Sequence, residues 1–543
     1  MRLLPQLTTY LRFVRGLPAF VRSSMSLEEA RDTIRRRVAE REQNFLRSIE
    51  RGVFERERSP YRVLLERAGC DLADIRQMVG RDGLESTLRT LRAAGVYITF
   101  EEFKGLQPIV RDGQVIEARP EDFDNPLLSS YYRVSTGGTT GKARKVMVDL
   151  DSLTDRVAEH MVAEDIYGLL GVPCLLWFDI MPGTGLGSVL NRVPYGNIPE
   201  RWYSPIASSD LKPAMRYRLA NRIIVETARL SGAPIPRPKL LRMDQADVIA
   251  RWAADTLEKH GQCVVRTHVS KALRVCIAAR EMGIDLTGAV ISAGGEPPTE
   301  AKVREIERTG ARFLSGYHFT EVGAVGLSCL NPVDSNDQHL FKDHLALIQH
   351  PRPVPGFDQT VDAFYFSTLL PTAPKLLLNV ESDDCGLVET RACGCPWEEF
   401  GFTEHIRHIR SFRKLTGEGV TLLGGQMERI LEEVLPQRFG GTPLDYQLLE
   451  EEDEQGFTRL SVVVSPKVSL DNEQAVIDTV VAALRGGSLG ADVSGAVWSR
   501  AGTLRVKRME PIWTGRGKLV PLHMDRSSRP SADGAPSRVG TRS

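Results

Sequence analysis

Between residue 146 and about residue 320, helical patterns alternate with short apolar runs at 174–178, 263–265 and 289–292. A short apolar run between helical segments is typical of a buried strand. Strands that alternate with helices predict a layered α/β domain. At 543 residues the chain has room for about two to four average domains, so this segment is one part of a larger architecture.

The composition excludes several classes of function. Hydrophobic residues make up 42% and charged residues 26%, as in ordinary soluble globular proteins. The 70 Lys and Arg residues balance the 70 Asp and Glu residues, so no global field attracts nucleic acid or an anionic surface. No apolar run reaches about 18 residues, and the eight cysteines are scattered rather than grouped as a disulfide framework. We expect a cytoplasmic protein with no transmembrane segment and no nucleic-acid partner.

The two ends of the chain differ from its middle. Residues 1–25 carry four arginines and no acid among apolar side chains, which suits a helix on a membrane surface or a helix docked on the protein's own body. The docked helix is the favoured interpretation. Residues 26–56 predict one charged amphipathic helix with Ser26 as its N-cap. From Arg526 onward the sequence is mostly Ser, Arg, Pro and Gly, so disorder is expected.

A loop at residues 135–145 gathers groups that bind phosphate. Three glycines, four hydroxyl residues and three cations fall within its eleven positions. Glycines let backbone N–H groups approach an anion, while hydroxyls donate to phosphate oxygens and cations offset their charge. The P-loop of the NTPases is excluded, because Ala143 follows Gly141–Lys142 and Thr136 stands where its first glycine belongs. The alternative is a mobile surface loop without a ligand.

Two later runs end in residues suited to binding a nucleotide. The first runs from Ile291 to Pro297 and places Gly294 and Gly295 at the end of a buried strand, where ligands bind in open α/β sheets. The second, 313–321, ends in an aromatic ring, a hydroxyl and a carboxylate. Tyr317 offers a flat face for a purine, and Glu321 is a hard oxygen ligand suited to Mg²⁺. Taken singly, each run could equally be a plain turn or an ordinary strand end.

Further motifs follow in order. An acidic run at 381–386 contains Asp384, Arg410 precedes a Gly and a Met-Glu pair, and Lys518 closes a Gly-rich run near the C-terminus. In this order, over most of residues 135–518, the motifs resemble those of the adenylate-forming acyl ligase superfamily. The spacing and length are most similar to the phenylacetate–CoA ligases within it.

The resemblance implies a fold and a division into domains. The expected fold is α/β, with a large multi-layered adenylate-forming domain and a small mobile α+β C-terminal domain. The divisions are an N-terminal helical extension (1–58), the large domain (59–410), the small lid domain (411–525) and a disordered tail (526–543).

The resemblance also implies roles for the motif residues. Lys518, Glu321 and Thr320 would be catalytic, with Glu321 holding Mg²⁺. The ATP site would comprise Ser135, Thr136, Gly137, Gly138, Thr139, Thr140, Gly141, Lys142, Gly294, Gly295, Glu296, Tyr317, His318, Asp384 and Arg410. Within this set, the loop hydroxyls would hold the β,γ-phosphates, Tyr317 would frame the adenine and Asp384 would hold the ribose.

A separate set of residues points to a metal. In some phenylacetate–CoA ligase relatives, a Cys, a His and a Cys-x-Cys at these places bind a structural zinc, here Cys329, His339, Cys393 and Cys395. Three thiolates and one imidazole would close a tetrahedral site without an open position. The alternative is a group of unrelated buried thiols, and His344 and His350 compete with His339 as the histidine ligand.

The chain departs from the family pattern at informative places. Gly137 replaces a Ser in the phosphate loop, and His318 stands where the family has Gly. The hinge Asp that should follow Arg410 is missing, because residues 411–414 read Ser-Phe-Arg-Lys. The small domain of relatives rotates about that Asp between two half-reactions, so its loss makes the CoA half-reaction less safe to assume.

The function expected from the resemblance is ATP-dependent activation of a carboxylic acid to an acyl-adenylate, followed by transfer to CoA. The alternatives are transfer to a carrier-protein thiol or an amine, and a catalytically silent nucleotide-binding homologue. Trp177, Phe178 and Trp202 could line an acyl pocket for an aryl or other apolar acid, or could equally be core. The partners considered are a small carboxylic acid, an acyl carrier protein and a second copy of the chain.

Overall fold

The computed structural model describes most of the chain. Its described residues are 3–56, 58–129, 131–135, 145–205, 215–295, 298, 300–353, 360–411, 414–417, 420–423, 430–452, 458–485, 504–512 and 522–524. The predicted tail therefore lies outside the described residues.

The central element is a 12-stranded sheet in the order β13-β14-β15-β16-β12-β11-β10-β9-β8-β5-β6-β7. From β7 to β10 neighbouring strands are parallel, and from β10 to β13 they are antiparallel. The strands are β5 (Cys174–Trp177), β6 (Arg201–Ser204), β7 (Lys239–Leu240), β8 (Cys263–His268), β9 (Ala289–Gly294), β10 (Arg312–Phe319), β11 (Gly323–Ser328), β12 (Gln338–Leu340), β13 (Leu345–Pro353), β14 (Thr360–Thr368), β15 (Val380–Thr390) and β16 (Glu404–Ser411).

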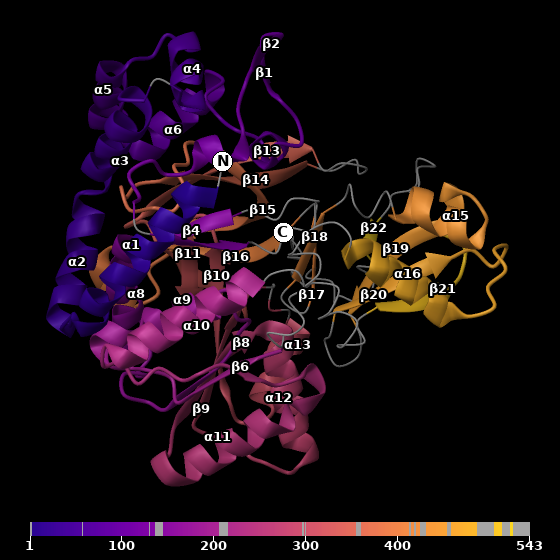
Figure 1. The fold of residues 1–543 in the computed structure, drawn as a ribbon. Helices are drawn as coiled ribbons and strands as arrows, with labels where there is room; N and C mark the ends of the chain where they lie inside the picture. The colour runs from indigo at the N-terminus through magenta and orange to yellow at the C-terminus, as the bar shows by residue number, and fades with distance from the viewer. Residues whose placement is uncertain are drawn as a thin grey trace, which may run out of the picture.

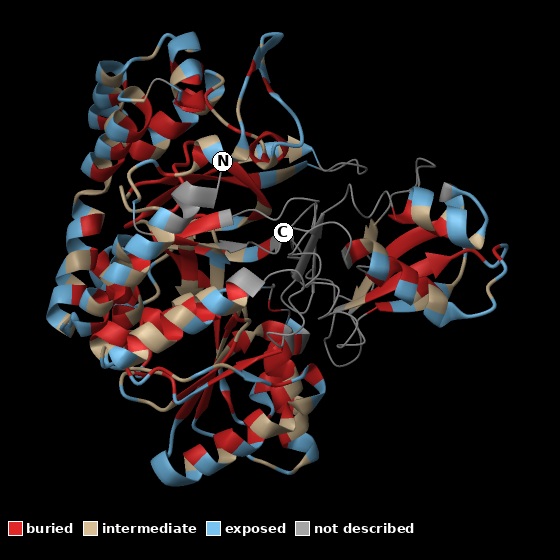
Figure 2. Ribbon diagram, in the orientation of Figure 1, coloured by how far each residue is buried: buried red, intermediate tan, exposed pale blue. Residues whose placement is uncertain are grey.

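Within the parallel half, β5, β8 and β9 are buried on both faces, which explains their continuous apolar runs. Side chains alternate along β5: Leu176 joins one hydrophobic core, while Leu175 and Trp177 join another on the opposite face. Figure 2 shows these strands as buried. The covering helices are α8 (Leu150–Ile166), α9 (Gly185–Leu190), α10 (Met215–Leu230), α11 (Asp247–His260), α12 (Val269–Glu281) and α13 (Glu300–Glu307).

The N-terminal residues form helices that pack on this domain (Figure 1). In α1, Phe13 and Leu17 are fully buried, and the Tyr10 hydroxyl donates to the Ala220 carbonyl at 3.0 Å. These contacts agree with the docked-helix interpretation. The helices are α1 (Leu3–Arg22), α2 (Leu27–Ala39), α3 (Arg41–Ile49), α4 (Pro60–Arg67), α5 (Leu72–Asp82), α6 (Leu84–Ala93) and α7 (Phe100–Lys104).

The expected single helix over 26–56 is wrong in its length. Ser26 does cap α2, because its side chain accepts a hydrogen bond from the Glu29 N–H. The helix then ends at Ala39, and α3 and a π-helical turn at Glu50–Phe54 follow. The buried apolar residues of α2 join one hydrophobic core, while those of α3 and the π-helical turn join another, so tertiary packing overrides the continuous helical pattern.

Among the described residues, three two-stranded sheets accompany the large one. β3 (Tyr131–Ser135) and β4 (Lys145–Asp149) are antiparallel, with Ser135 opposite Lys145, so they bracket the phosphate-loop sequence. The other two sheets are β1 (Ile109–Arg111) with β2 (Gln114–Ile116), and β17 (Lys414–Gly417) with β18 (Val420–Leu423).

The C-terminal residues form a smaller sheet in the order β21-β20-β19-β22, which lies to one side of the large domain in Figure 1. Its elements are β19 (Tyr446–Glu452), β20 (Thr458–Val464), β21 (Leu504–Arg508), β22 (Leu522–Met524), α15 (Leu435–Phe439) and α16 (Glu473–Arg485). The predicted α/β class, with a large domain and a small α+β C-terminal domain, is confirmed. Among the described helices, none combines the length and apolar character needed to cross a membrane.

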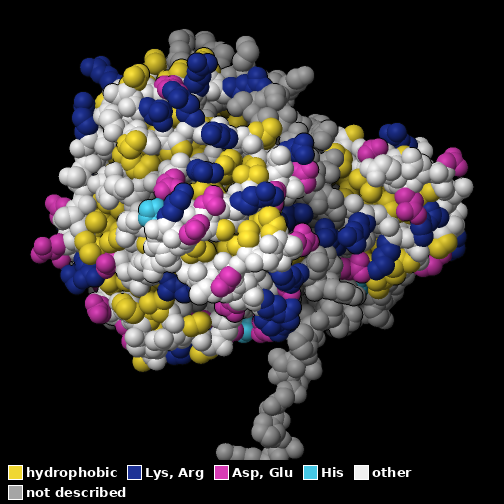
Figure 3. Space-filling view, turned by 90° about the horizontal axis from the view of Figure 1, so that it is seen from below, with side chains coloured by type: hydrophobic (Ala, Val, Ile, Leu, Met, Phe, Trp, Pro, Cys, Tyr) yellow, Lys and Arg dark blue, Asp and Glu magenta, His cyan; other side chains and the backbone are white. Residues whose placement is uncertain are grey.

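The described surface carries both signs of charge. Figure 3 shows Lys and Arg side chains interspersed with Asp and Glu side chains across the face seen from below. This distribution agrees with the equal numbers of basic and acidic residues in the sequence.

Candidate functional site

The strand ends predicted to bind a nucleotide meet at one place in the sheet. Gly294 ends β9 and lies opposite Gly316 of β10 on one side and His268 of β8 on the other. A Cβ at Gly294 would lie 2.4 Å from the Gly316 carbonyl oxygen. Gly295 has φ +83°, and a Cβ there would lie 2.6 Å from His268 Nδ1. Both glycines are therefore required by the close approach of three strands.

The hydroxyl of Tyr317 contacts Asp384, the residue predicted to hold the ribose. It donates to Asp384 Oδ2 at 2.6 Å, which joins β10 to β15 across 67 residues of sequence. Burial, followed by the neighbouring Asp384 carboxylate, raises the pKa of the Tyr317 phenol well above its ordinary value, so the hydroxyl remains a donor. The Tyr317 ring lies 6.4 Å from the Phe366 ring. Two residues expected to bind the same nucleoside are thus in direct contact.

A buried glutamine fixes the backbone at Tyr317. The pairing of β10 with β11 shifts between Tyr317 and His318, which leaves the Tyr317 N–H outside the regular ladder. Gln338 Oε1 accepts from that N–H at 2.8 Å, and Gln338 Nε2 donates to Ser315 Oγ at 3.1 Å. No local signal in the sequence marks Gln338, because its role depends on β12 lying beside β11.

Thr320 and Glu321 occupy the turn between β10 and β11. The Val322 N–H donates to the Phe319 carbonyl at 2.9 Å, and Gly323 completes the turn with φ +110°. Glu321 is only 2% exposed, while Thr320 is half-buried. The predicted Mg²⁺ ligand is therefore a carboxylate held in a tight hairpin.

Other predicted residues are placed only in part. Ser135 is the last residue of β3, and Arg410 lies in β16 opposite Cys385, so it is next to Asp384 in the sheet. His318 is exposed, with its ring against Gly316. The residues that lie outside the described residues are Thr136, Gly137, Gly138, Thr139, Thr140, Gly141, Lys142, Glu296 and Lys518.

The aromatic residues considered for an acyl pocket are mostly core. Trp177 is fully buried and Trp202 is 1% exposed, and each donates its indole N–H to a backbone carbonyl. Phe178 is half-buried and meets the His268 ring edge-on at 5.1 Å. Of these three aromatic residues, Phe178 is therefore the one that remains a candidate to line an acyl pocket.

Polar groups also lie at this edge of the sheet, and the sequence did not single them out. Lys271 has a side chain 1% exposed and contacts Asp179 at 3.2 Å, beside the carboxyl ends of β5 and β8. Burial, and then the charge of Lys271, lowers the pKa of His268 to about 4, so this imidazole is neutral near pH 7. The signal that could have found them is their position just after two predicted strands.

The predicted metal ligands are brought together, with one addition. Ligand atoms of Cys329, His339, Cys393 and His405 all lie within 4.8 Å of one another. Cys395 is also close, since its thiol is hydrogen-bonded to the side chains of Cys329 and His339. Thiol and imidazole donors in a buried cluster fit Zn²⁺. Sequence reasoning missed His405, which no Cys-x-Cys or fixed spacing marks.

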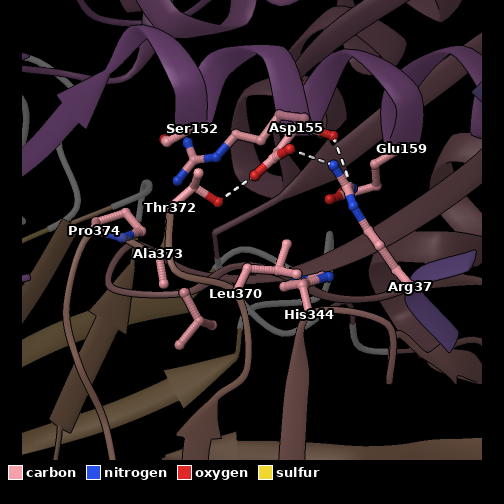
Figure 4. Close-up of a pocket in the computed structure, with 11 residues that line it drawn as sticks. Arg37, Ser152, Asp155, Glu159, His344, Leu370, Thr372, Ala373 and Pro374 are labelled. Carbon is pink, nitrogen blue, oxygen red and sulfur yellow. Dashed lines mark hydrogen bonds and ion pairs between the residues drawn. The ribbon is translucent and has the colours of Figure 1, made fainter. Parts of the chain in front are cut away.

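Figure 4 shows a small cavity lined mainly by residues of α2 and α8 and of the loop at 370–374. Its volume is about 30 Å³, room for a few water molecules at most, so it is no nucleotide site. Arg37 donates to Asp155 Oδ1 at 2.5 Å, and Thr372 donates to the same carboxylate. The cavity is part of the ion-pair network that attaches α2 to the large domain.

Two titratable groups of this network have shifted pKa values. Burial raises the pKa of Glu159 to about 7. Burial opposes protonation of His344, but the Asp343 carboxylate outweighs it and raises the pKa of His344. The His344 ring contacts Asp343 Oδ1 and the Ala324 carbonyl, each at 2.8 Å, so both ring nitrogens face acceptors.

Known proteins resemble the chain in structure but not in sequence. No family model matches the chain, and no curated protein matches its sequence. One similar structure is a 2-hydroxyisobutyryl-CoA ligase in an open conformation, in complex with 2-HIB-AMP and CoA. It is 13% identical, with a TM-score of 0.41, and the match covers 89% of this chain and 93% of that chain.

Two further structures resemble it at comparable identity. An amide bond synthetase (the McbA K483A mutant) from Marinactinospora thermotolerans is 12% identical, covering 94% of this chain and 98% of that chain with a TM-score of 0.39. An acyl-CoA synthetase (AMP-forming)/AMP-acid ligase II-like protein from Dyadobacter fermentans is 14% identical, covering 72% and 87% with a TM-score of 0.27.

Proposed function

We propose that the chain is an adenylate-forming ligase that activates a carboxylic acid with ATP. The observation that carries the proposal is the 2.6 Å contact between Tyr317 and Asp384. It joins the residues expected at the adenine and the ribose, beside an edge of the sheet where Gly294 and Gly295 keep the backbone bare. A nucleoside needs such a combination of a flat ring, a hydroxyl-binding carboxylate and close backbone approach.

The reaction would be an in-line displacement. A carboxylate oxygen of the acid attacks the α-phosphorus of ATP, a new C–O–P linkage forms, and the bond to the β-phosphate oxygen breaks to release pyrophosphate. No covalent enzyme intermediate is needed, so positioning and charge neutralisation supply most of the catalysis. Lys518 would offset the charge that develops between carboxylate and phosphate, and the hydroxyls of the 135–145 loop would hold the departing phosphates.

Two residues of the turn between β10 and β11 would act at the phosphates. The Thr320 hydroxyl would donate to the α-phosphate. Glu321 would hold Mg²⁺, which neutralises phosphate charge when bound. Because Glu321 is buried in a tight hairpin, its carboxylate has little freedom to move when the nucleotide binds.

The acyl group would then pass to CoA. The CoA sulfur attacks the acyl carbonyl carbon, a thioester forms and AMP leaves. Transfer to a carrier-protein thiol or an amine is the second candidate, favoured by Ser411, which stands where relatives have the hinge Asp. The acid would be an aryl or other apolar acid, a class supported here by Phe178. A structural Zn²⁺ in the cysteine–histidine cluster, cytoplasmic location and the predicted domain divisions belong to the same proposal.

The test is ATP–pyrophosphate exchange across a panel of aryl and fatty acids, without CoA and then with it. Acid-dependent exchange is expected, and thioester formation on adding CoA would identify the acceptor. Exchange without thioester would favour the carrier protein or amine. If no acid supports exchange although ATP binds, the catalytically silent nucleotide-binding homologue is favoured. If ATP does not bind either, the proposal fails.

A further inference from the structure

A series of charged contacts connects the N-terminal helix α2 to the turn between β10 and β11. Arg37 of α2 donates to the carboxylate and to the backbone carbonyl of Asp155, which lies in α8 (Figure 4). Arg37 Nη1 also lies 3.8 Å from Asp343 Oδ2. Because Arg37 is only 8% exposed, its guanidinium is a buried charge that faces two carboxylates.

His344 joins these contacts to the turn. Its Nδ1 lies 2.8 Å from Asp343 Oδ1, and its Nε2 lies 2.8 Å from the carbonyl oxygen of Ala324, the second residue of β11. Burial acts to raise the pKa of Asp343, but the charge of His344 outweighs it, so the pKa is lowered and the carboxyl is ionised. A carbonyl or an ionised carboxylate can only accept, so both ring nitrogens of His344 carry protons and the ring is cationic.

The Ala324 carbonyl lies at the base of the hairpin that β10 and β11 form. Phe319 of β10 pairs with Gly323 of β11, so residues 320–322 are the loop of this hairpin and Ala324 is the next residue along the strand. A hydrogen bond donated by a cationic ring is charge-assisted and about twice as strong as a neutral one. The bond from His344 therefore restrains the strand at the point where the loop closes.

Side chains of the same network also surround the end of the turn. Gly323 has φ +110°, a conformation that favours glycine. A Cβ at Gly323 would lie 3.8 Å from Arg156 Nε and 4.0 Å from His344 Nε2. Val322 lines the cavity of Figure 4 together with Arg37 and His344. The turn is therefore packed against the charged network that begins at α2.

The attachment of helices to the large domain does not by itself require buried charges. Helix α1 packs on the same domain through apolar side chains such as Phe13 and Leu17. Buried ion pairs are a weak source of stability, because desolvation of the charges opposes their attraction. Charged hydrogen bonds do fix the relative positions of the groups they join, since they depend on both distance and direction.

We infer that His344 is a positioning residue, which holds the hairpin so that Thr320 and Glu321 face the phosphates of ATP. Helix α2 supports His344 through the contacts of Arg37 and Asp343. This inference rests on the proposed function, which assigns Thr320 to the α-phosphate and Glu321 to Mg²⁺. It gives the N-terminal extension a part in the reaction, because α2 is the element that supplies Arg37.

Two amide variants separate the two hydrogen bonds of His344. The amide nitrogen of Gln takes the place of Nε2, so His344→Gln keeps a donor toward the Ala324 carbonyl. The amide nitrogen of Asn takes the place of Nδ1, so His344→Asn keeps a donor toward Asp343 and loses the one toward Ala324. Both variants remove the same positive charge, so a difference between them reports the hydrogen bond to Ala324.

The first experiment does not depend on enzyme activity. Amide hydrogen exchange is measured in the full-length protein, over peptides that cover residues 318–326. His344→Asn should exchange about tenfold faster there than the wild type, and His344→Gln should stay close to the wild type. Arg37→Ala should resemble His344→Asn, and Arg36→Ala is its matched control, because Arg36 is the preceding residue of α2 and is exposed. Equal exchange in the two His344 variants, or faster exchange throughout the molecule, would overturn the inference.

The second experiment tests the effect on the reaction. In ATP–pyrophosphate exchange, His344→Asn should lower the rate about tenfold and raise the Mg²⁺ concentration required, and His344→Gln should restore most of both. A Mg²⁺ dependence that stays unchanged in His344→Asn would limit His344 to a structural role and refute the inference. If the wild type supports exchange with no acid, the proposed function fails, while the hydrogen-exchange comparison still decides whether His344 holds the turn.

Discussion

Replacing Tyr317 with Phe removes the hydroxyl that donates to Asp384 at 2.6 Å and keeps the ring. A hydrogen bond to a charged group contributes about 1.5–3 kcal/mol. At about 1.4 kcal/mol for each factor of ten, its loss corresponds to about 10- to 100-fold. If Asp384 holds the ribose, Tyr317→Phe should raise the Kd for ATP by about tenfold or more, because the carboxylate loses the donor that positions it.

The chain offers a matched control on the neighbouring strands. The Tyr365 hydroxyl donates to Glu381 Oε2, also at 2.6 Å, and Glu381 is fully buried. Tyr365→Phe therefore removes the same kind of bond from a carboxylate outside the proposed nucleotide site. Both variants should unfold at lower temperature than the wild type, but only Tyr317→Phe should bind ATP more weakly.

The measurements are ATP binding by calorimetry and thermal unfolding of the three proteins. The comparison separates a local defect from general destabilisation, since each substitution removes a tyrosine–carboxylate hydrogen bond of the same length. Equal ATP affinity in Tyr317→Phe and Tyr365→Phe would refute the placement of the ribose at Asp384.

Three further predictions concern single groups. Lys518→Ala should lower adenylation by about 100-fold or more in pyrophosphate exchange while the Kd for ATP is unchanged, and a near-wild-type rate would remove its assigned role. Glu321→Gln should lower the exchange rate and raise the Mg²⁺ concentration it requires, and an unchanged Mg²⁺ dependence would contradict its role as a ligand. Burial raises the pKa of Glu159 from 4.5 to about 7, so its stabilising, protonated form is lost as pH rises from about 4.5 through 7. The side chain of Glu159→Gln cannot ionise, so this variant should be more stable than the wild type at pH 8 by up to about 3 kcal/mol in denaturant unfolding. The two proteins should differ little near pH 4.5. A variant less stable than the wild type at pH 8 would refute the raised pKa of Glu159.

Much of the candidate site could be predicted from the sequence because its motifs are local. A Gly-Gly pair after an apolar run predicts a strand end with a bare backbone, and the structure places Gly294 and Gly295 there. The Ser26 cap is equally local, since it depends on Glu29 three residues on. Such features follow from backbone sterics and neighbouring hydrogen bonds, which a few residues fix.

Other features depended on which strands lie side by side. Trp177 and Trp202 are core residues because the two faces of the parallel strands are both covered, which local sequence does not specify. The break of the 26–56 helix has the same origin, as its segments pack on different cores.

The sequence by itself determined the α/β class, the order of the motifs and most members of the cysteine–histidine cluster. Only the tertiary structure decided that Tyr317 meets Asp384, that Gln338 holds the backbone at Tyr317, and that His405 joins the cluster. Each of these contacts joins residues distant in sequence. They depend on strand order and register, which are set by the packing of whole cores rather than by any short stretch of chain.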